Sequence, residues 1–130
     1  MKGPEDFDKL DWSLASLEKD KSFQMHLECA RILVEKMGNE VPTGALISGP
    51  FTAAASIYPV EKLLRATIKN PEIVHKLMRN CTDVLKEVHN EFIKAGAMIL
   101  FCEPIATGSI ISGKIFGEFV LPYIQELMKN

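Results

Sequence analysis

The chain has 130 residues, a formal net charge of -2, 47% hydrophobic residues and 25% charged residues, which is typical of a soluble globular protein. Its lysines and arginines are spread along the chain, which argues against a nucleic-acid-binding protein, and no apolar run approaches the roughly 18 residues that span a bilayer. The three cysteines show no paired spacing and the N-terminus is not a signal peptide, so we expect a cytoplasmic protein with reduced thiols.

The N-terminal half of the chain predicts an irregular arm, a helix, a strand and a short helix. Residues 1–19 show no clear hydrophobic period and predict the arm. From about Asp20, apolar residues recur at helical spacing until Gly38, a typical C-terminal cap. The apolar run 45–47 predicts a buried strand that ends in a tight turn, and the alanine-rich stretch 51–58 favours a short helix.

The C-terminal half predicts two more helices, a second strand and a last helix. A helix resumes over 60–70, after Pro59, and Asn70 with Pro71 marks the start of a long helix that ends at Gly96. The apolar run 97–102 has the pattern of a fully buried strand. A loop over 103–112 leads to the last helix, which we expect Ser112 to cap and Pro122 to kink or restart.

Buried strands separated by long helices indicate parallel βα units, but two strands cannot form a sheet with both faces covered. The segment therefore looks like part of a larger α/β fold. In such folds ligands bind beyond the carboxyl ends of the strands. The candidate site residues at these two ends are Gly49, Phe51, Thr52, Cys102, Glu103, Thr107 and Ser109.

Glu103 has two interpretations, because a carboxylate directly after a buried strand is costly unless it is paired, hydrogen-bonded or solvated. As a functional group it would accept hydrogen bonds from a ligand or handle a proton. As a structural group it would cap a nearby helix or pair with a lysine. Its position in the sequence leaves both interpretations open.

The histidines and the remaining cysteines predict a structural role. His26 and Cys29 are three residues apart on one helix face, but two ligands do not make a zinc site, and His75 and His89 are too far apart to share an ion. We therefore expect no metal site within the chain and partly exposed histidines on helices. Cys29 and Cys81 fall on apolar stripes and are expected in the core.

The stretch from Gly49 to Tyr123 resembles the uroporphyrinogen decarboxylase superfamily. The marks are "GPFT" after the first strand, "EKLLRATIKNPEIVHKLMRNCTDVL" in the helices, "AGA" before the second strand and "EPIATGSIISGKIFGEFVLPY" after it. With "NEVPTGALISGPFT" upstream, the resemblance covers roughly residues 20 to 130. It implies a TIM (β/α)8 barrel, of which residues 1–130 would be a central slice with about two βα units and long helices.

A slice of a barrel would be a fragment or a divergent short relative, and we expect it to be inactive alone. It would expose sheet edges and apolar helix faces, which makes a homo-oligomer possible. The same exposed surfaces also allow a non-enzymatic hypothesis, in which the chain is a self-associating module without catalysis.

The superfamily has two main branches, and two positions discriminate between them here. Uroporphyrinogen decarboxylases of tetrapyrrole (heme) biosynthesis use no cofactor and usually show Asp/Glu-Ser-x-Ala-Gly together with an earlier tyrosine. This chain has Pro104 at the serine position and Ser56 at the tyrosine position, with Tyr58 two residues away. The other branch transfers methyl groups from a methylcobamide on a corrinoid protein to coenzyme M, another thiol or tetrahydrofolate, and "EPIATGSIIS" looks more like this branch.

The resemblance to the methyltransferase branch implies Glu103 as the catalytic or orienting carboxylate, with a corrinoid protein and a small-molecule methyl acceptor as partners. It also adds Ser56 to the substrate-binding residues given above. Thiol-specific members hold a zinc ion with His-x-Cys and a later cysteine. That motif would lie beyond Asn130, so zinc is possible only through residues outside these 130. The leading hypothesis is a corrinoid-dependent methyltransferase of one-carbon metabolism, and the decarboxylase is the alternative.

Overall fold

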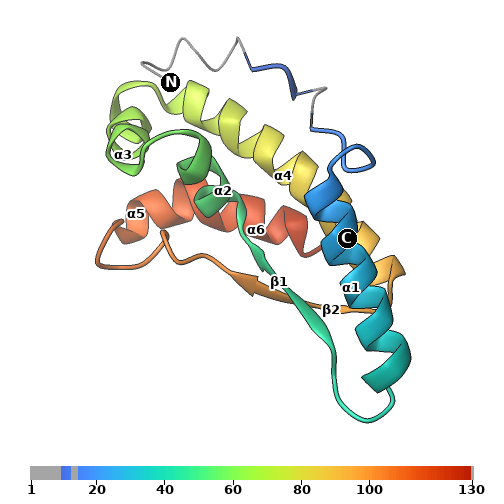
Figure 1. Cartoon of the computed structure of the whole chain (residues 1–130). Coiled ribbons are helices and arrows are strands. Elements are labelled where there is room, and N and C mark those ends of the chain that lie inside the picture. The colour runs from blue at the N-terminus through green and yellow to red at the C-terminus, as the bar shows by residue number, and fades with distance from the viewer. Residues whose placement is uncertain (1–9, 13–14, 130) are drawn as a thin grey trace.

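A computed structural model describes residues 10–12 and 15–129 of the chain (Figure 1). Most of the predicted N-terminal arm, including residues 1–9 and 13–14, lies outside the described residues, and turns occupy positions 17–19. The helices gather on one side of a pair of strands (Figure 1). In chain order the elements are α1 Lys21–Met37, β1 Gly44–Ser48, α2 Pro50–Ile57, α3 Val60–Lys69, α4 Pro71–Lys94, β2 Met98–Cys102, α5 Gly113–Ile115, the π-helix η3 Phe116–Val120 and α6 Leu121–Leu127.

The helix ends follow the capping residues in the sequence. Asp20 caps α1, because its carboxylate accepts hydrogen bonds from the backbone N–H of Ser22 at 2.9 Å and of Phe23 at 3.1 Å. Gly96 follows α4 with φ at +82°, a left-handed conformation that favours glycine after a helix. Gly38, which we expected to end α1 in the same way, has φ at -61° and remains right-handed.

The predicted order of helices and strands is confirmed, and the two strands form one parallel sheet. The register pairs Gly44 with Met98 at one end and Ser48 with Cys102 at the other. Since α2, α3 and α4 connect two parallel strands, the chain contains one complete βα crossover and the beginning of the next.

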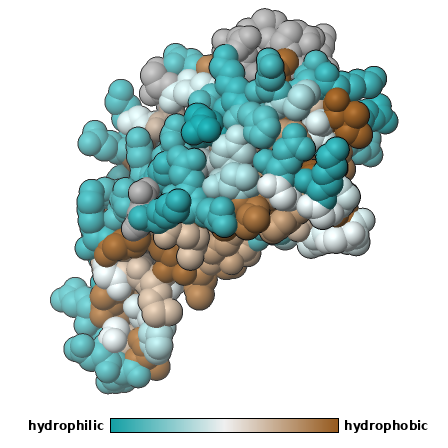
Figure 2. All heavy atoms as spheres, turned by 180° about the vertical axis from the view of Figure 1, so that it is seen from behind, coloured by the Kyte–Doolittle hydropathy of each residue, from teal (hydrophilic) through white to brown (hydrophobic). Residues whose placement is uncertain are grey.

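The prediction of fully buried strands is wrong for one face of the sheet. The face toward the helices packs into a hydrophobic core through Ala45, Ile47, Ile99 and Phe101, together with Leu27, Leu85, Phe92 and Leu127. On the opposite face Leu46 is 72% exposed, Met98 53% and Leu100 51%, because no element of the described chain covers it. Figure 2 shows hydrophobic side chains gathered on the rear of the molecule, along the part where Figure 1 places the strands.

A second core lies where α2, α3 and α4 meet the C-terminal helices. Its fully buried side chains include Phe51, Leu63, Met78 and Phe119, and Cys81 lies among them as predicted. The same prediction is wrong for Cys29, which is exposed. The apolar stripe of α1 buries only Leu27 against the rest of the protein, so Cys29 lies at the open side of this helix.

The last helix is interrupted at the position where Pro122 predicted a kink or restart. Ser112 caps α5 by accepting a hydrogen bond from the Ile115 N–H at 3.2 Å, as expected. The wide π turn of η3 follows, and α6 begins with Pro122 in its first turn, where the missing N–H of proline costs nothing.

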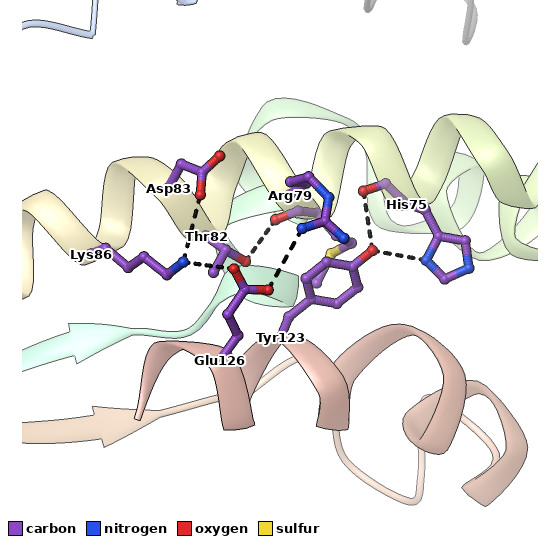
Figure 3. Close-up of polar contacts among 8 residues, drawn as sticks. His75, Arg79, Thr82, Asp83, Lys86, Tyr123 and Glu126 are labelled. Atoms are coloured by element: carbon purple, nitrogen blue, oxygen red, sulfur yellow. Dashed lines mark hydrogen bonds and ion pairs between the residues drawn. The ribbon is translucent and has the colours of Figure 1, made fainter. Parts of the chain in front are cut away.

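Polar side chains fasten α6 to α4 (Figure 3). The Lys86 ammonium donates to Glu126 at 2.6 Å, and Arg79 lies 3.7 Å from the same carboxylate. The hydrogen bond from Lys86 lowers the pKa of Glu126. The Tyr123 hydroxyl lies 2.8 Å from Nδ1 of His75 and donates to the carbonyl oxygen of His75 at 3.2 Å. These contacts hold α6 against α4.

One histidine differs from the expectation of partly exposed histidines. His89 is 4% exposed, and its Nε2 atom has no hydrogen-bond partner. Burial lowers the pKa of His89, because the charged imidazolium loses its hydration there. Within the described residues, no helix is both long enough and apolar enough to cross a bilayer.

Candidate functional site at the strand ends

The carboxyl ends of β1 and β2 meet at one edge of the sheet. Ser48 is paired with Cys102, and the N–H of Gly49 continues the pairing by donating to the Cys102 carbonyl oxygen at 2.8 Å. α2 begins at Pro50, and the loop over 103–112 begins directly opposite it. The fold therefore brings Gly49 and Thr52 from one strand end together with Cys102 and Glu103 from the other.

Glu103 binds the first turn of α2 with both carboxylate oxygens. Oε1 accepts a hydrogen bond from the Phe51 N–H at 2.8 Å. Oε2 accepts one from the Thr52 N–H at 2.9 Å and another from the Thr52 hydroxyl at 2.6 Å. These bonds, which we call the Glu103 network, satisfy two N–H groups that a helix start leaves without an intrahelical partner. The carboxylate also carries the charge that the positive end of the helix dipole favours.

The Thr52 hydroxyl extends this network into the loop after β2. It donates to Glu103 and lies 3.5 Å from the backbone N–H of Ile105, which donates to it. The N–H of Ala106 donates to the backbone carbonyl of Glu103 at 3.1 Å and closes a turn. Thr52 and Glu103 together therefore fix the path of the chain over 103–106 against the start of α2.

Gly49 allows the two strand ends to approach this closely. A Cβ atom at Gly49 would lie 2.2 Å from Oε1 of Glu103 and 2.4 Å from Cζ of Phe101. Both distances are far below van der Waals contact, so any side chain at this position would displace the carboxylate or the ring. The candidate site thus depends on the absence of a side chain at Gly49.

Two cysteines, Cys81 and Cys102, lie near the strand ends. Burial, followed by the negative charge of Glu103, raises the pKa of Cys81 to about 12, so this residue stays a neutral thiol at physiological pH. Cys102 is half-buried, with its sulfur 3.8 Å from the Ile47 carbonyl oxygen.

The other predicted site residues lie around the Glu103 network without joining it. The Phe51 side chain is fully buried in the core, so its part in the network is its backbone N–H. Ser56 is exposed on α2 and its hydroxyl donates to the Thr52 carbonyl at 3.0 Å. Thr107 and Ser109 are exposed and their hydroxyls are 2.9 Å apart. Among the described residues, no hydrogen bond joins Ser56, Thr107 or Ser109 to Glu103.

The described residues do not form a metal centre. Residues 10–12 and 15–129 contain no group of three or more His, Cys, Asp or Glu side chains that could hold an ion. His26 and Cys29 both line a groove between α1 and β1, but no third ligand accompanies them. The donor set of a zinc site is therefore not present in this part of the chain.

A basic pocket beside α3 was not predicted from the sequence. Lys62, Arg65 and Lys69 line it, and their i, i+3, i+7 spacing would have placed them on one helix face. Tyr58 lines the same pocket and is 3% exposed. The α4–α6 contacts of Tyr123 were also missed, although Tyr123 ends the most specific stretch of the resemblance.

Comparison with known proteins connects this arrangement to methyltransferases. A methylated-thiol–coenzyme M methyltransferase of Methanosarcina mazei is 37% identical over 91 residues, which are 69% of this chain and 25% of that protein. The methylcobamide:CoM methyltransferase MtaA of Methanosarcina barkeri is 27% identical over 101 residues, covering 77% of this chain and 30% of the relative. The chain thus spans about a quarter to a third of the length of these relatives.

A solved structure confirms that the fold is part of a TIM barrel. A methyltransferase from Methanosarcina mazei superimposes with a TM-score of 0.78 at 25% sequence identity, and the match covers 82% of this chain and 32% of that structure. The model of the uroporphyrinogen decarboxylase (URO-D) family matches residues 1–130, the entire sequence. The chain therefore belongs to the uroporphyrinogen decarboxylase family and forms a part of its barrel.

Proposed function

We propose that this chain is part of an enzyme that transfers a methyl group from a methylcobamide, carried by a corrinoid protein, to a thiol, with coenzyme M as the first acceptor to test. The observation that carries the proposal is the similarity to coenzyme M methyltransferases, one of them named for methylcobamide, over 69% and 77% of the chain. The decarboxylase alternative has less support, because Pro104 replaces the serine of its strand-end motif.

The reaction proposed here is a displacement at carbon. The electron pair of the acceptor thiolate forms the new carbon–sulfur bond, while the pair of the cobalt–carbon bond stays with cobalt and the thiol proton leaves to a base. A displacement of this kind gains most from holding the two reactants in line. The protein needs an acceptor site of fixed shape more than it needs a proton relay at the strand ends.

In this proposal Glu103 is the residue that shapes the acceptor site. Its carboxylate accepts three hydrogen bonds from the start of α2, and a carboxylate offers about four such positions, so one position remains for a ligand. The exposed hydroxyls of Ser56, Thr107 and Ser109 surround the strand ends and would supply polar contacts to the acceptor. Gly49 would allow the backbone of the two strand ends to approach closely. Phe51 and Cys102 would form the floor of the site.

The activation of the thiol is assigned to residues outside the described part of the chain. A zinc ion would supply a Lewis acid that holds the acceptor as a thiolate. The donor set for such an ion is not found within residues 10–12 and 15–129. We expect the 130-residue chain to be inactive alone, since its matched regions cover only 25% and 30% of these relatives.

The test uses the polypeptide that carries this segment in its host, with the 130-residue chain beside it. Each is mixed with methylcobalamin and either coenzyme M, another small thiol or tetrahydrofolate, and the corrin absorbance is followed. We expect demethylation that depends on coenzyme M with the longer polypeptide. Demethylation with tetrahydrofolate alone would identify a pterin acceptor instead. No acceptor-dependent change, together with release of carbon dioxide from uroporphyrinogen, would establish the decarboxylase.

A further inference from the structure

The pocket beside α3 concentrates positive charge on a chain whose net charge is -2. α3 buries Leu63, Ala66 and Thr67 and presents its opposite face to solvent. At the border between these two faces lies a hollow of about 230 Å³, which we call the basic pocket. It is lined by Tyr58, Lys62, Arg65, Ala66, Lys69 and Asn70.

No acidic side chain lines the basic pocket. Arg65 and Lys69 form no ion pair with any described residue. Glu61 and Glu72 lie near the two ends of α3 but do not line the pocket. Tyr58 gives the pocket one fixed wall, because its ring is buried in the core. A pocket lined by basic side chains and by no acid is suited to an anionic group.

The basic pocket lies at the same end of the sheet as the Glu103 network, the end at which the strands terminate. α2 begins at the carboxyl ends of the strands, and the 24 residues of α4 then run back over about 36 Å to the amino end of β2. α3 lies between α2 and the start of α4 in the chain, so it lies near the carboxyl ends of the strands. Figure 1 shows α3 at the end of α4 that is farthest from the turn between α1 and β1.

We propose that the basic pocket and the exposed Ile68 beside it form a docking site for an acidic surface of the protein that presents the methyl donor. This inference rests on the proposed function, which requires a second protein to approach the carboxyl ends of the strands. Ile68 is 79% exposed on the same helix. A free anion would leave Ile68 in water, whereas a protein surface would cover it as well as pair with Arg65 and Lys69.

The alternative occupants fit the pocket less well. A corrin macrocycle is much larger than a hollow of about 230 Å³, so the pocket does not hold the cofactor itself. Exposed, flexible cations bind a single small anion weakly in water, because solvent screens each charge. The same cations arranged over a surface steer a charged partner during association, which is the effect that a transient delivery complex requires.

The test measures binding of a methylcobamide-loaded corrinoid protein to the 130-residue chain by isothermal titration at about 20 and about 200 mM salt. The variants are Arg65→Glu/Lys69→Glu and the milder Arg65→Gln/Lys69→Gln. The matched control is Lys19→Glu/Lys36→Glu, which makes the same change in net charge at two exposed lysines near the ends of α1. Circular dichroism spectra establish that every variant keeps the helical content of the wild type.

We expect the charge-reversed pocket variant to bind roughly tenfold or more weakly at low salt, with the glutamine variant between it and the wild type. The control is expected to stay within about twofold of the wild type, and high salt should remove most of the difference. Equal affinities of pocket variant and control would overturn the docking site. So would displacement of the corrinoid protein by about 5 mM inorganic phosphate, since the pocket would then be a small-anion site.

Failure of this inference and failure of the proposed function are distinguishable. Free methylcobalamin has no protein surface, so its acceptor-dependent demethylation by the longer polypeptide should be unchanged by Arg65→Glu/Lys69→Glu. Loss of binding together with unchanged demethylation supports the docking site. If wild-type chain and variants all fail to bind the corrinoid protein, the docking inference is wrong, whatever the result with free methylcobalamin.

Discussion

Replacing Glu103 with alanine is expected to destabilise the chain more than an ordinary substitution at a half-buried position. The change removes three hydrogen bonds and leaves the N–H groups of Phe51 and Thr52 without a partner. Loss of a helix N-cap acceptor costs about 0.5–2 kcal/mol, and a hydrogen bond to a charged group contributes about 1.5–3 kcal/mol. Water will replace part of the loss at this half-exposed edge, so we expect the free energy of unfolding to fall by about 2–3 kcal/mol.

Two further variants separate the parts of the Glu103 network. Glu103→Gln keeps one carbonyl oxygen as an acceptor and is expected to cost about 1 kcal/mol. Thr52→Val keeps the shape and the backbone N–H but removes the hydroxyl that bonds Glu103 at 2.6 Å, at a cost of about 1–1.5 kcal/mol. Because the two side chains share this bond, the double variant should lose about 0.5–1 kcal/mol less than the sum of the single losses.

The assay is urea unfolding at a fixed protein concentration. Fluorescence of Trp12, the one tryptophan, follows the transition because this side chain is half-buried against the core of α2, α3 and α4. A shift in midpoint at constant m-value measures the loss of stability. A loss below about 0.5 kcal/mol for Glu103→Ala, or strict additivity with Thr52→Val, would refute the argument that the network holds the two strand ends together.

Three further predictions concern pH, thiols and association. Burial lowers the pKa of His89, so below about pH 6.5 the unfolded chain takes up a proton before the folded chain does. The free energy of unfolding should therefore fall as the pH decreases from 6.5. The urea midpoint of His89→Leu should lack this pH dependence. Cys29 is exposed and Cys81 is buried with its pKa raised to about 12, so iodoacetamide should label Cys29 in the folded chain and Cys81 only after unfolding, as mass spectrometry of the digest will show. The exposed sheet face should drive self-association, so light scattering should report a mass above 14.5 kDa that falls toward it in Leu46→Ser/Leu100→Ser; a monomeric wild type would contradict this.

The order of elements could be predicted because each boundary carries a local signal. Asp20 and Ser112 cap helices with their own side chains, Gly96 takes the left-handed turn after α4, and Pro122 restarts the last helix. These effects act within one or two turns of chain and do not depend on what lies beyond the segment. The exact first and last residues of a helix are harder to predict than the helix itself, because helix ends fray over one or two residues.

Burial could not be predicted in the same way, because it depends on neighbours that are distant in the sequence. Leu46 and Leu100 have the composition of buried strand residues, yet they are exposed since no described element covers that face. Cys29 was predicted on an apolar stripe, but Leu27 is the one α1 side chain that is fully buried, and Phe23, Ala30 and Val34 are only partly buried. His89 shows the opposite error: a polar side chain is buried because α4 is covered on that side by the strands and α6.

The role of Glu103 was undecided in the sequence because both interpretations require the same residue at the same position. The structure shows the helix-capping interaction in detail, with two backbone N–H groups and one hydroxyl as donors. Capping does not exclude a part in the proposed reaction, but it changes what that part is. Three donors already occupy most of the positions at which this carboxylate can accept a hydrogen bond, which favours a positioning part.

For methyl transfer this arrangement is an advantage. A displacement at carbon needs the donor and acceptor in line and a rigid site around them, and it needs no proton exchange with a strand-end carboxylate. Glu103 and Thr52 connect the loop after β2 to the start of α2, and they would thereby fix two neighbouring walls of the proposed acceptor site relative to each other. The residues that activate the acceptor are then free to lie on other strands of the barrel, which is consistent with a segment that spans only a quarter to a third of its relatives.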